Sequence, residues 1–201
     1  TLVFETYIRS LVFEVETAKD KAERYANSME EKVRERTRQL EEMTRTDALT
    51  GLLNVRHLEE SVTKTLRSAQ RRAEPVSVVY FDIDDFKKLN DTQGHQRGDE
   101  ILRAVGTAMK SISRIEDSCF RYGGDEFCVV LSNCRAEEAQ ERFVARLNER
   151  IKAYADNVSL SSGIAQTGPN EYLDASTLIR RADEGMYAAK QALKARAQEK
   201  I

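Results

Sequence analysis

Two groups of carboxylates stand where an apolar stretch of the sequence ends. Asp82 and Asp84 follow the β-branched and aromatic run of residues 76–81. The adjacent pair Asp125 and Glu126 follows two glycines between two apolar stretches. Carboxylates at the end of a buried strand have lost much of their water and need cations or hydrogen-bond donors nearby. If the two segments pair as neighbouring strands, their charges come together, and such hard oxygen ligands suit Mg²⁺ shared with a phosphate substrate.

Each of these features, taken alone, has a simpler structural explanation. A Gly-Gly-Asp sequence is a common hairpin turn, and an aspartate at a strand end often caps the following helix. The last helical stretch carries a third group suited to phosphate, Lys190. The combination favours a metal and phosphate site over separate structural roles.

Apolar periodicity predicts the elements that must position these groups. Helical spacing extends over residues 55–69, 101–112, 139–151 and about 175–197. Strand-like runs extend over residues 76–83, 119–122, 127–131 and 158–167, and residues 92–98 are expected to form a loop. The resulting order, a helix followed by β-α-β-β-α-β-α, predicts an α+β fold with a mostly antiparallel central sheet flanked by helices.

The N-terminal segment has a different character. Residues 6–46 contain no Pro or Gly, are dense in charge and repeat apolar residues at helical spacing. Such an exposed helix needs a partner, so we predict a coiled coil over residues 1–46 that forms a homodimer, and a globular domain over 47–201. Two heptad registers compete in this segment, and the pattern fits either a slightly irregular dimer stalk or a two-register switch that transmits a signal.

Composition excludes several classes of partner. The 32 basic residues against 34 acidic residues give a formal net charge of −2, which favours neither nucleic acid nor a membrane surface. The three cysteines lack metal-ligand spacing and are expected to be reduced core thiols. No apolar run is long enough to span a bilayer, so a cytoplasmic location is expected. Because the sequence starts at Thr1 in mid-pattern, we expect it to be cut from a longer protein with an upstream sensor domain.

Four motifs together resemble one known family. RYGGDEF, DALTGLLN, DIDDFKKLNDTQGHQRGDEIL and RADEGMYAAK occur in the order and spacing of the GGDEF family of diguanylate cyclases, from about Asp47 to the end of the chain. The resemblance implies the GGDEF fold, which is similar to the nucleotidyl cyclase palm. It also implies that a homodimer condenses two GTP into cyclic di-GMP and two pyrophosphates, with two Mg²⁺ ions per active site or Mn²⁺ in their place.

The resemblance also assigns residues to the active site. It implies that Asp82, the backbone carbonyl of Ile83 and Asp125 hold metal, with Glu126 assisting at the second ion, and that Asp125 and Glu126 are the catalytic pair. In the same way, Asn90 and Asp99 would read guanine, His95 would lie against the nucleotide, Lys87 and Lys190 would meet the phosphates, and Gly123 and Gly124 would let the triphosphate approach the backbone.

Two of these assignments also have simpler explanations. One carboxylate can accept both N1–H and N2–H₂ of guanine, which suits Asp99. An aspartate in the first turn of a helix can instead compensate the helix dipole. A single histidine in a loop, such as His95, is more often an ordinary hydrogen-bonding residue.

The sequence departs from the family after Lys190. A Gly-Arg-Asn-like turn usually follows that position, whereas this chain continues with QALKAR in a helical pattern. Lys194 falls at the position of the phosphate-binding arginine and supplies charge without the bidentate guanidinium. The strength of phosphate binding and the final edge strand are therefore in doubt.

The segment RIED, residues 114–117, matches the family's RxxD inhibitory site in type and spacing. Arg114 could pair with a phosphate and guanine of the product, and Asp117 with a guanine donor edge. The two side chains could instead form a surface ion pair of little energetic value.

Three rival functions are compatible with parts of this pattern. A degenerate GGDEF module would bind GTP or cyclic di-GMP as a sensor without turnover. A structural module would only dimerise and relay a signal. A nucleotide cyclase that uses one GTP would need no dimer.

Overall fold

The computed structural model describes residues 19, 21, 23–34, 36 and 45–198. The chain divides into two compact units, residues 1–44 and 45–201. The described residues of the first unit are helical and exposed, including the side chains of Tyr25, Met29 and Val33. Most of residues 1–46, over which the coiled coil and its two heptad registers are predicted, lie outside the described ones.

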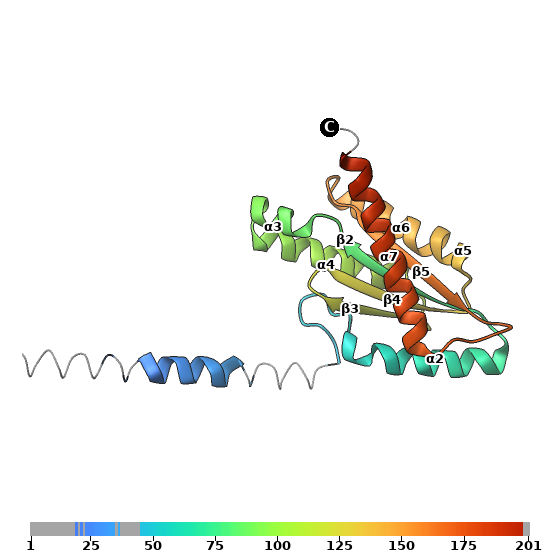
Figure 1. The fold of residues 1–201 in the computed structure, drawn as a ribbon, viewed down its shortest axis with the longest axis horizontal. Coiled ribbons are helices and arrows are strands. Elements are labelled where there is room, and N and C mark those ends of the chain that lie inside the picture. The colour runs from blue at the N-terminus through green and yellow to red at the C-terminus, as the bar shows by residue number, and fades with distance from the viewer. Residues whose placement is uncertain (1–18, 20, 22, 35, 37–44, 199–201) are drawn as a thin grey trace, which may run out of the picture. The chain divides into compact units, whose positions relative to one another are not determined.

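The second unit is a five-stranded sheet with helices on both faces (Figure 1). Its elements in chain order are β1 (Leu53–Asn54), a 3₁₀ turn (Val55–His57), α2 (Leu58–Arg72), β2 (Val76–Ile83), α3 (Phe86–Gln93), α4 (His95–Ile112), β3 (Ser118–Gly123), β4 (Glu126–Ser132), α5 (Ala136–Glu138), a π-helical segment (Ala139–Val144), α6 (Ala145–Tyr154), β5 (Leu160–Thr167) and α7 (Ala175–Gln198).

The sheet is mixed, with the strand order β1-β3-β4-β2-β5. The short strand β1 runs parallel to β3, and the other three pairs are antiparallel. The predicted α+β fold with a mostly antiparallel sheet is confirmed for residues 45–198. The two-residue strand β1 carries no periodic signal, so the sequence analysis missed it.

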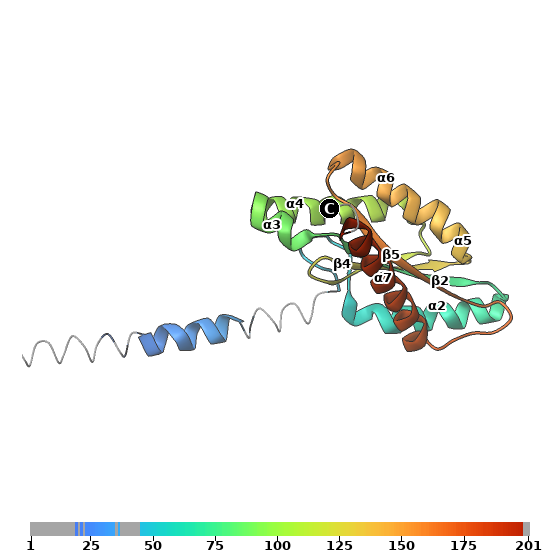
Figure 2. The same ribbon diagram turned by 45° about the horizontal axis from the view of Figure 1, so that its top comes forward.

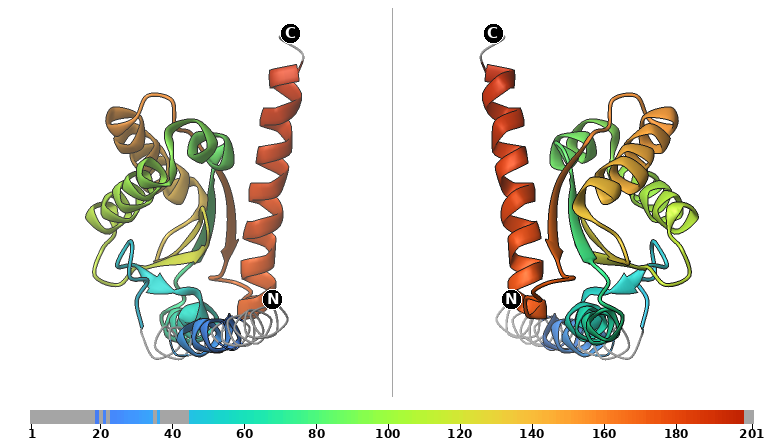
Figure 3. Two further views of the ribbon diagram at one scale, coloured as in Figure 1. Left: turned by 90° about the vertical axis from the view of Figure 1, so that its left-hand side faces the viewer. Right: turned by 90° about the vertical axis from the view of Figure 1, so that its right-hand side faces the viewer.

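Strand β2 is an interior strand of the sheet, and both of its faces are covered. All eight of its residues are buried, as the unbroken apolar run predicts. On one face, Phe81 and Ile83 pack under α4 and α6, and on the other face, Val78 and Tyr80 pack under α2 and α7. Figure 3 shows the sheet edge-on, with the red helix α7 on one side and helices α4 and α6 on the other.

Helix α7 lies closer to the sheet than an ordinary side chain would allow. A Cβ atom added at Gly163 of β5 would collide with the backbone of α7 at Ala182 and Met186. The missing side chain therefore sets the distance between helix and sheet, and it places the later turns of α7 beside the end of β2.

The segment between β2 and β3 corrects the sequence analysis. Residues 92–98, expected to be a loop, lie in the last turn of α3 and the first turn of α4, with a break at Gly94. Gly94 has a φ of 85°, a value that favours glycine, so the chain reverses there in one residue. Helices α3 and α4 thus form a tight pair at the end of the sheet (Figure 2).

Candidate active site

The predicted metal residues converge at the end of β2, where β4 pairs with it. Asp82 lies directly opposite Glu126 in the antiparallel register. The next residue, Ile83, donates its backbone N–H to the carbonyl of Asp125 at 3.2 Å. Residues 44 positions apart in the chain are therefore neighbours, as the pairing of the two segments predicts.

Burial and mutual repulsion disfavour the charged form of these carboxyl groups. Burial raises the pKa of Asp82, the hydrogen bond from Lys190 opposes this, and the charge of Asp125 raises it further. The pKa of Glu126 is also raised, first by burial and then by the negative charges of Asp82, Asp125 and Asp183. A nearby positive charge would therefore favour the charged form of Asp82 and Glu126.

Lys190 supplies part of that charge. Its Nζ lies 2.6 Å from Oδ1 of Asp82, whose side chain is only 6% exposed. This contact joins α7 to the end of β2, and it brings the lysine predicted to meet phosphate to the carboxylate cluster itself. Lys194, one turn later, lies on an exposed part of α7. The helix continues to Gln198, as the QALKAR sequence predicts.

The donor set fits a divalent cation that is shared with a ligand. Within the described part of the chain, no three His, Cys, Asp or Glu side chains form a group that could hold a metal ion by themselves. Mg²⁺ does not need one, because it usually binds through one or two carboxylates together with substrate phosphates and water. Asp82, Glu126 and Asp125 offer such oxygen ligands at one edge of the sheet.

A cavity of about 340 Å³ lies between α7, the sheet and the start of α2, and it includes Tyr80, Tyr122 and Asp183 in its lining. Asp183 is close enough to raise the pKa of Glu126. Asp183 lies within the RADEGMYAAK motif, but the motif alone predicted no role for it. The signal available in the sequence was that Asp183 lies on the same predicted helix as Lys190.

The two glycines of the hairpin are not required by the turn itself. Neither Gly123 nor Gly124 has a φ in the left-handed region, in contrast to Gly51, Gly94 and Gly168. A Cβ at Gly124 would meet nothing within 4 Å, and one at Gly123 would make an ordinary contact with Glu126. An ordinary turn role does not explain these glycines, whereas a ligand that approaches the backbone closely would.

The residues predicted to read guanine lie together on the α3–α4 pair. Asn90 is in the last turn of α3, and Gly98 of α4 lies so close to it that a Cβ there would collide with the Asn90 side chain. Within the described residues, the buried Oδ1 of Asn90 has no hydrogen-bond partner. Asp99 is half-buried in the second turn of α4, and Oδ2 is 3.8 Å from Arg103.

His95 and Lys87 are both exposed on this pair of helices. Their positions leave them accessible to a ligand, and among the described residues neither makes a contact that fixes its role. His95 lies at the first residue of α4 and Lys87 at the second residue of α3.

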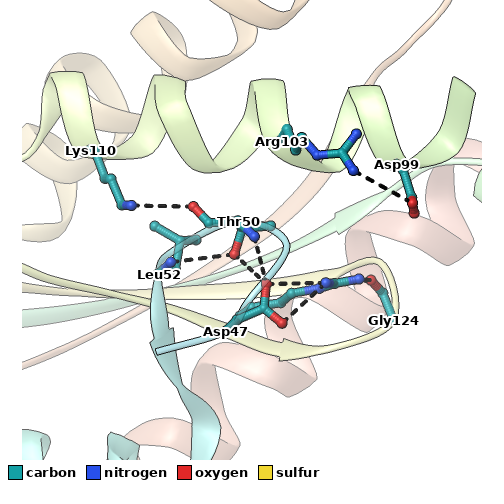
Figure 4. Close-up of polar contacts among 8 residues, drawn as sticks. Asp47, Thr50, Leu52, Asp99, Arg103, Lys110 and Gly124 are labelled. Carbon is teal, nitrogen blue, oxygen red and sulfur yellow. Dashed lines mark hydrogen bonds and ion pairs between the residues drawn. The ribbon is translucent and has the colours of Figure 1, made fainter. Parts of the chain in front are cut away.

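Polar contacts connect the tip of the β3–β4 hairpin to the first turn of the globular unit (Figure 4). Arg121 donates to the carbonyl of Gly124 from Nη2 at 2.7 Å and from Nε at 3.2 Å. Its Nη1 lies 3.2 and 3.3 Å from the two carboxylate oxygens of Asp47. Both residues were within motifs noted in the sequence, but nothing in the sequence indicated this contact across 74 positions.

Comparison with known proteins agrees with this arrangement. Residues 44–196 match the family described as "Diguanylate cyclase, GGDEF domain". The chain belongs to the GGDEF diguanylate cyclase family.

Two curated relatives illustrate the similarity. Diguanylate cyclase DosC of Escherichia coli (strain K12) is 41% identical over 154 residues, which cover 72% of this chain and 32% of DosC. Response regulator PleD of Caulobacter vibrioides (strain NA1000 / CB15N) is 36% identical over 162 residues, which cover 74% of this chain and 34% of PleD. The chain thus spans about a third of the length of these two relatives.

Solved GGDEF structures have the same fold. The coiled coil and GGDEF domain of DgcB from Caulobacter crescentus, in complex with c-di-GMP, superposes with a TM-score of 0.64 at 26% identity, covering 83% of this chain and 91% of that one. Diguanylate cyclase SiaD of Pseudomonas aeruginosa, in complex with its activator SiaC, gives a TM-score of 0.66 at 29% identity and covers 94% of this chain and 73% of SiaD.

The predicted inhibitory residues of this GGDEF protein lie away from the carboxylate cluster, in the turn before β3. The backbone N–H of Arg114 donates to Oδ2 of Asp117 at 2.8 Å, and Oδ1 of Asp117 accepts from the N–H of Ser132 at 3.3 Å. Within the described residues, no ion pair joins the Arg114 guanidinium to Asp117, so the simple surface ion pair is not what the turn contains. Burial raises the pKa of Asp117, and these backbone donors oppose the rise.

A small cavity of about 70 Å³ adjoins this turn. Besides Arg114 and Asp117, its lining includes Arg142 and Arg146 from the π-helical segment and α6. Three arginines therefore line one hollow together with Asp117 and Glu138, so cationic residues are in excess there. The two additional arginines had no motif to mark them, because only the fold brings this helix beside the RIED turn.

The remaining observations concern the cysteines and the membrane. Cys119, Cys128 and Cys134 are buried free thiols, and burial raises the pKa of both Cys119 and Cys134 to about 11. They are structural residues, as expected. Among the described helices, none combines the length and the apolar character that crossing a bilayer requires.

Proposed function

We propose that this protein is a Mg²⁺-dependent diguanylate cyclase that condenses two GTP into cyclic di-GMP and two pyrophosphates. One observation carries the proposal: the register of β2 and β4 sets Asp82 opposite Glu126, beside a Gly-Gly tip that no turn geometry requires. Membership of the GGDEF family supports the same reaction.

The carboxylates would hold divalent metal ions together with the substrate phosphates. Asp82, the carbonyl of Ile83 and Asp125 are the proposed ligands, with Glu126 assisting at a second ion, and Mn²⁺ could replace Mg²⁺. When bound, such ions lower the pKa of the attacking 3′-hydroxyl and stabilise the charge that develops at the α-phosphate.

The protein's own side chains would position the nucleotide. Gly123 and Gly124 leave the hairpin backbone open to the triphosphate, and Lys190 sits where it can contact phosphate oxygens beside Asp82. Lys87 and Lys194 are exposed cations that would add charge on either side. Because a lysine lacks the bidentate guanidinium, Lys194 would contribute less to phosphate binding than an arginine.

The α3–α4 pair would read the base. Asp99 can accept two hydrogen bonds from the N1–H and N2–H₂ edge of guanine, an edge that adenine lacks. The amide of Asn90, with its buried and unpartnered Oδ1, would bind the same base, and His95 would lie against the nucleotide. Selection of GTP over ATP would then depend on Asp99 and Asn90 rather than on the carboxylate cluster.

We further propose that the active form is a homodimer in which each domain presents one GTP to the other. Two-fold symmetry suits a reaction whose product is itself symmetric. The segment 1–46 would hold the pair together and raise the effective concentration of the two domains.

The turn of Arg114 and Asp117 would bind the product and inhibit the enzyme. The presence of Arg142 and Arg146 in the lining of the adjoining cavity supports an anionic ligand there. Replacing Arg114 with alanine should remove most of the inhibition by added cyclic di-GMP, while turnover without added product stays within about twofold because the metal site is untouched. Product inhibition curves for wild type and Arg114→Ala test this, and identical curves would rule the site out.

The reaction itself is tested by incubating the protein with GTP and MgCl₂ and separating the nucleotides by chromatography with mass detection. The expected products are cyclic di-GMP and two pyrophosphates per molecule formed, and Asp125→Asn should fold normally but form no product. GTP binding without turnover would identify a sensor module instead. A monomeric cyclic nucleotide would identify a cyclase that uses one GTP, and an absence of nucleotide binding would leave a purely structural role.

A further inference from the structure

The Gly-Gly tip of the hairpin lacks the restraints that normally fix a strand end. The β3–β4 register shifts between Arg121 and Gly123, so regular pairing is interrupted just before the tip. Gly124 follows, and its missing side chain leaves open space. Two successive glycines give the backbone its greatest conformational freedom, yet Asp125 and Glu126 depend on this segment for their positions.

Arg121 supplies a restraint from within the same hairpin. Its guanidinium donates twice to the carbonyl of Gly124, and that carbonyl belongs to the peptide that leads into Asp125. The Arg121 side chain is only 15% exposed. One mostly buried side chain therefore holds the carbonyl of the Gly124–Asp125 peptide, in addition to the backbone hydrogen bond from Ile83 to the carbonyl of Asp125.

Asp47 in turn fixes Arg121. Its two carboxylate oxygens receive Nη1 of Arg121, and Oδ1 also accepts the N–H and the hydroxyl of Thr50 at 2.8 and 2.6 Å. Although burial acts to raise the pKa of Asp47, the bonds from Thr50 and the charge of Arg121 lower it. The carboxylate therefore stays ionised and holds the guanidinium in one orientation.

The turn that carries Asp47 is itself rigid. The N–H of Asp47 donates to the carbonyl of Leu52, whose side chain is fully buried. The carbonyl of Thr50 accepts from Lys110 of α4 at 3.2 Å (Figure 4). A Cβ at Gly106 would press on Thr50, so the missing side chain lets this turn pack directly against α4.

We propose that Arg121 is a positioning residue for the reaction, which fixes the Gly124–Asp125 peptide so that the hairpin carboxylates face Asp82, and that Asp47 is its anchor. This inference rests on the proposed cyclase function. It also means that the first turn of the globular unit, only a few residues after residue 44, is connected to the catalytic hairpin through two side chains.

The simpler alternative is that the Asp47–Arg121 pair only stabilises the fold. The two explanations differ in what a conservative substitution does. Arg121→Lys keeps the positive charge next to Asp47, but a single ammonium cannot bridge the carboxylate and the Gly124 carbonyl in the same fixed geometry. A stabilising role would tolerate this change with a lower melting temperature, whereas a positioning role would not.

The test compares wild type with Arg121→Lys, Asp47→Asn and the double variant in the full chain. Arg72→Lys is the matched control, because Arg72 pairs with Glu74 at 3.8 Å on an exposed end of α2. Each protein is assayed for kcat, KM for GTP, the Mg²⁺ concentration that gives half-maximal rate, and Tm. Hydrogen exchange at the amides of residues 123–125 provides a measurement that needs no substrate.

For Arg121→Lys we expect kcat to fall by about 10- to 100-fold, since misplacing a reacting group by about 1 Å costs that much. The Mg²⁺ concentration that gives half-maximal rate should rise. KM for GTP should stay within about threefold of the wild-type value, because α3 and α4, which are proposed to bind the base, are unchanged. Exchange at residues 123–125 should accelerate by about tenfold. Asp47→Asn should shift the same quantities, and the double variant should be no worse than the worse single variant.

The outcomes separate this inference from the proposed function. If wild type forms product and Arg121→Lys matches it in kcat, Mg²⁺ requirement and exchange, the positioning role is wrong and the cyclase stands. An activity loss that merely follows the unfolded fraction measured from Tm would also overturn it. If wild type forms no product from GTP but Arg121→Lys still accelerates exchange at the tip, the cyclase proposal fails and the role of Arg121 in fixing the hairpin holds.

Discussion

Glu126 shows, at the scale of a single residue, how the site departs from the most stable arrangement. Its pKa is raised by burial and by three neighbouring carboxylates, so its surroundings disfavour the charged form. Sites that bind cations often keep such repulsion, because the ligand's charge relieves it. Stability and function should therefore respond in opposite directions when this charge is removed.

We predict that Glu126→Gln raises Tm in metal-free buffer and lowers cyclic di-GMP formation by about 100-fold, as expected for the loss of one group that stabilises developing charge. Thermal unfolding and the GTP assay measure the two effects. Glu149→Gln, an exposed change on α6, should alter neither. A lower Tm for Glu126→Gln would show that the carboxylate stabilises the fold instead.

At the scale of elements, the sequence revealed those parts of the fold that depend on local pattern. The run of residues 76–83 predicted a central strand, and the spacing of apolar residues predicted α2 and α7 because their buried faces repeat at helical intervals. Helix α3 was missed, since its eight residues are mostly polar and bury only Leu89. Short elements of this kind are held by tertiary contacts more than by their own pattern.

The candidate site divides in the same way. The carboxylates and glycines lie within sequence motifs, and the predicted pairing of two strands was enough to place the carboxylates next to each other. The contact of Asp47 with Arg121 and the approach of Arg142 to the RIED turn depend on how distant elements pack. No local pattern specifies such contacts, because the same residues on an isolated helix or turn would be ordinary solvated charges.

Gly163 and Gly124 differ in what surrounds them, so substitutions at these two positions test whether helix packing and ligand access depend on a missing side chain. Gly163→Ala would push α7 away from β5, because the added Cβ collides with the helix backbone rather than with a flexible side chain. We predict a loss of about 3 kcal/mol in the free energy of unfolding, the upper part of the usual range for overpacking. Chemical denaturation measures it.

Gly124→Ala is the matched change at the hairpin tip, where the Cβ meets open space. We expect the free energy of unfolding to stay within about 0.5 kcal/mol of wild type while product formation falls at least tenfold, because the methyl group would occupy the path proposed for the triphosphate. A fully active Gly124→Ala would show that the tip does not contact the nucleotide, and a stable Gly163→Ala would show that α7 can shift without cost.

At the scale of the whole molecule, the chain joins a compact GGDEF unit to a charged N-terminal segment. The described residues of that segment are helical, and the side chains of Tyr25, Met29 and Val33 are each more than 60% exposed. Apolar side chains at helical spacing on an otherwise charged helix need a partner surface. This exposure is consistent with the proposal that residues 1–46 form the dimerisation element.

A reaction between two GTP molecules on two domains makes the role of this segment measurable. In the full chain, the product formed per mole of protein should be nearly independent of protein concentration, as expected if residues 1–46 form the proposed dimer stalk. In protein shortened to residues 45–201, a compact unit in the structure, the same quantity should rise in proportion to concentration, as expected when a second copy must be encountered in solution. Sedimentation at each concentration would relate activity to the dimeric fraction. A shortened protein with constant activity per mole, monomeric throughout, would mean that one domain completes the reaction alone, since chemistry within a single copy does not depend on how often two copies meet.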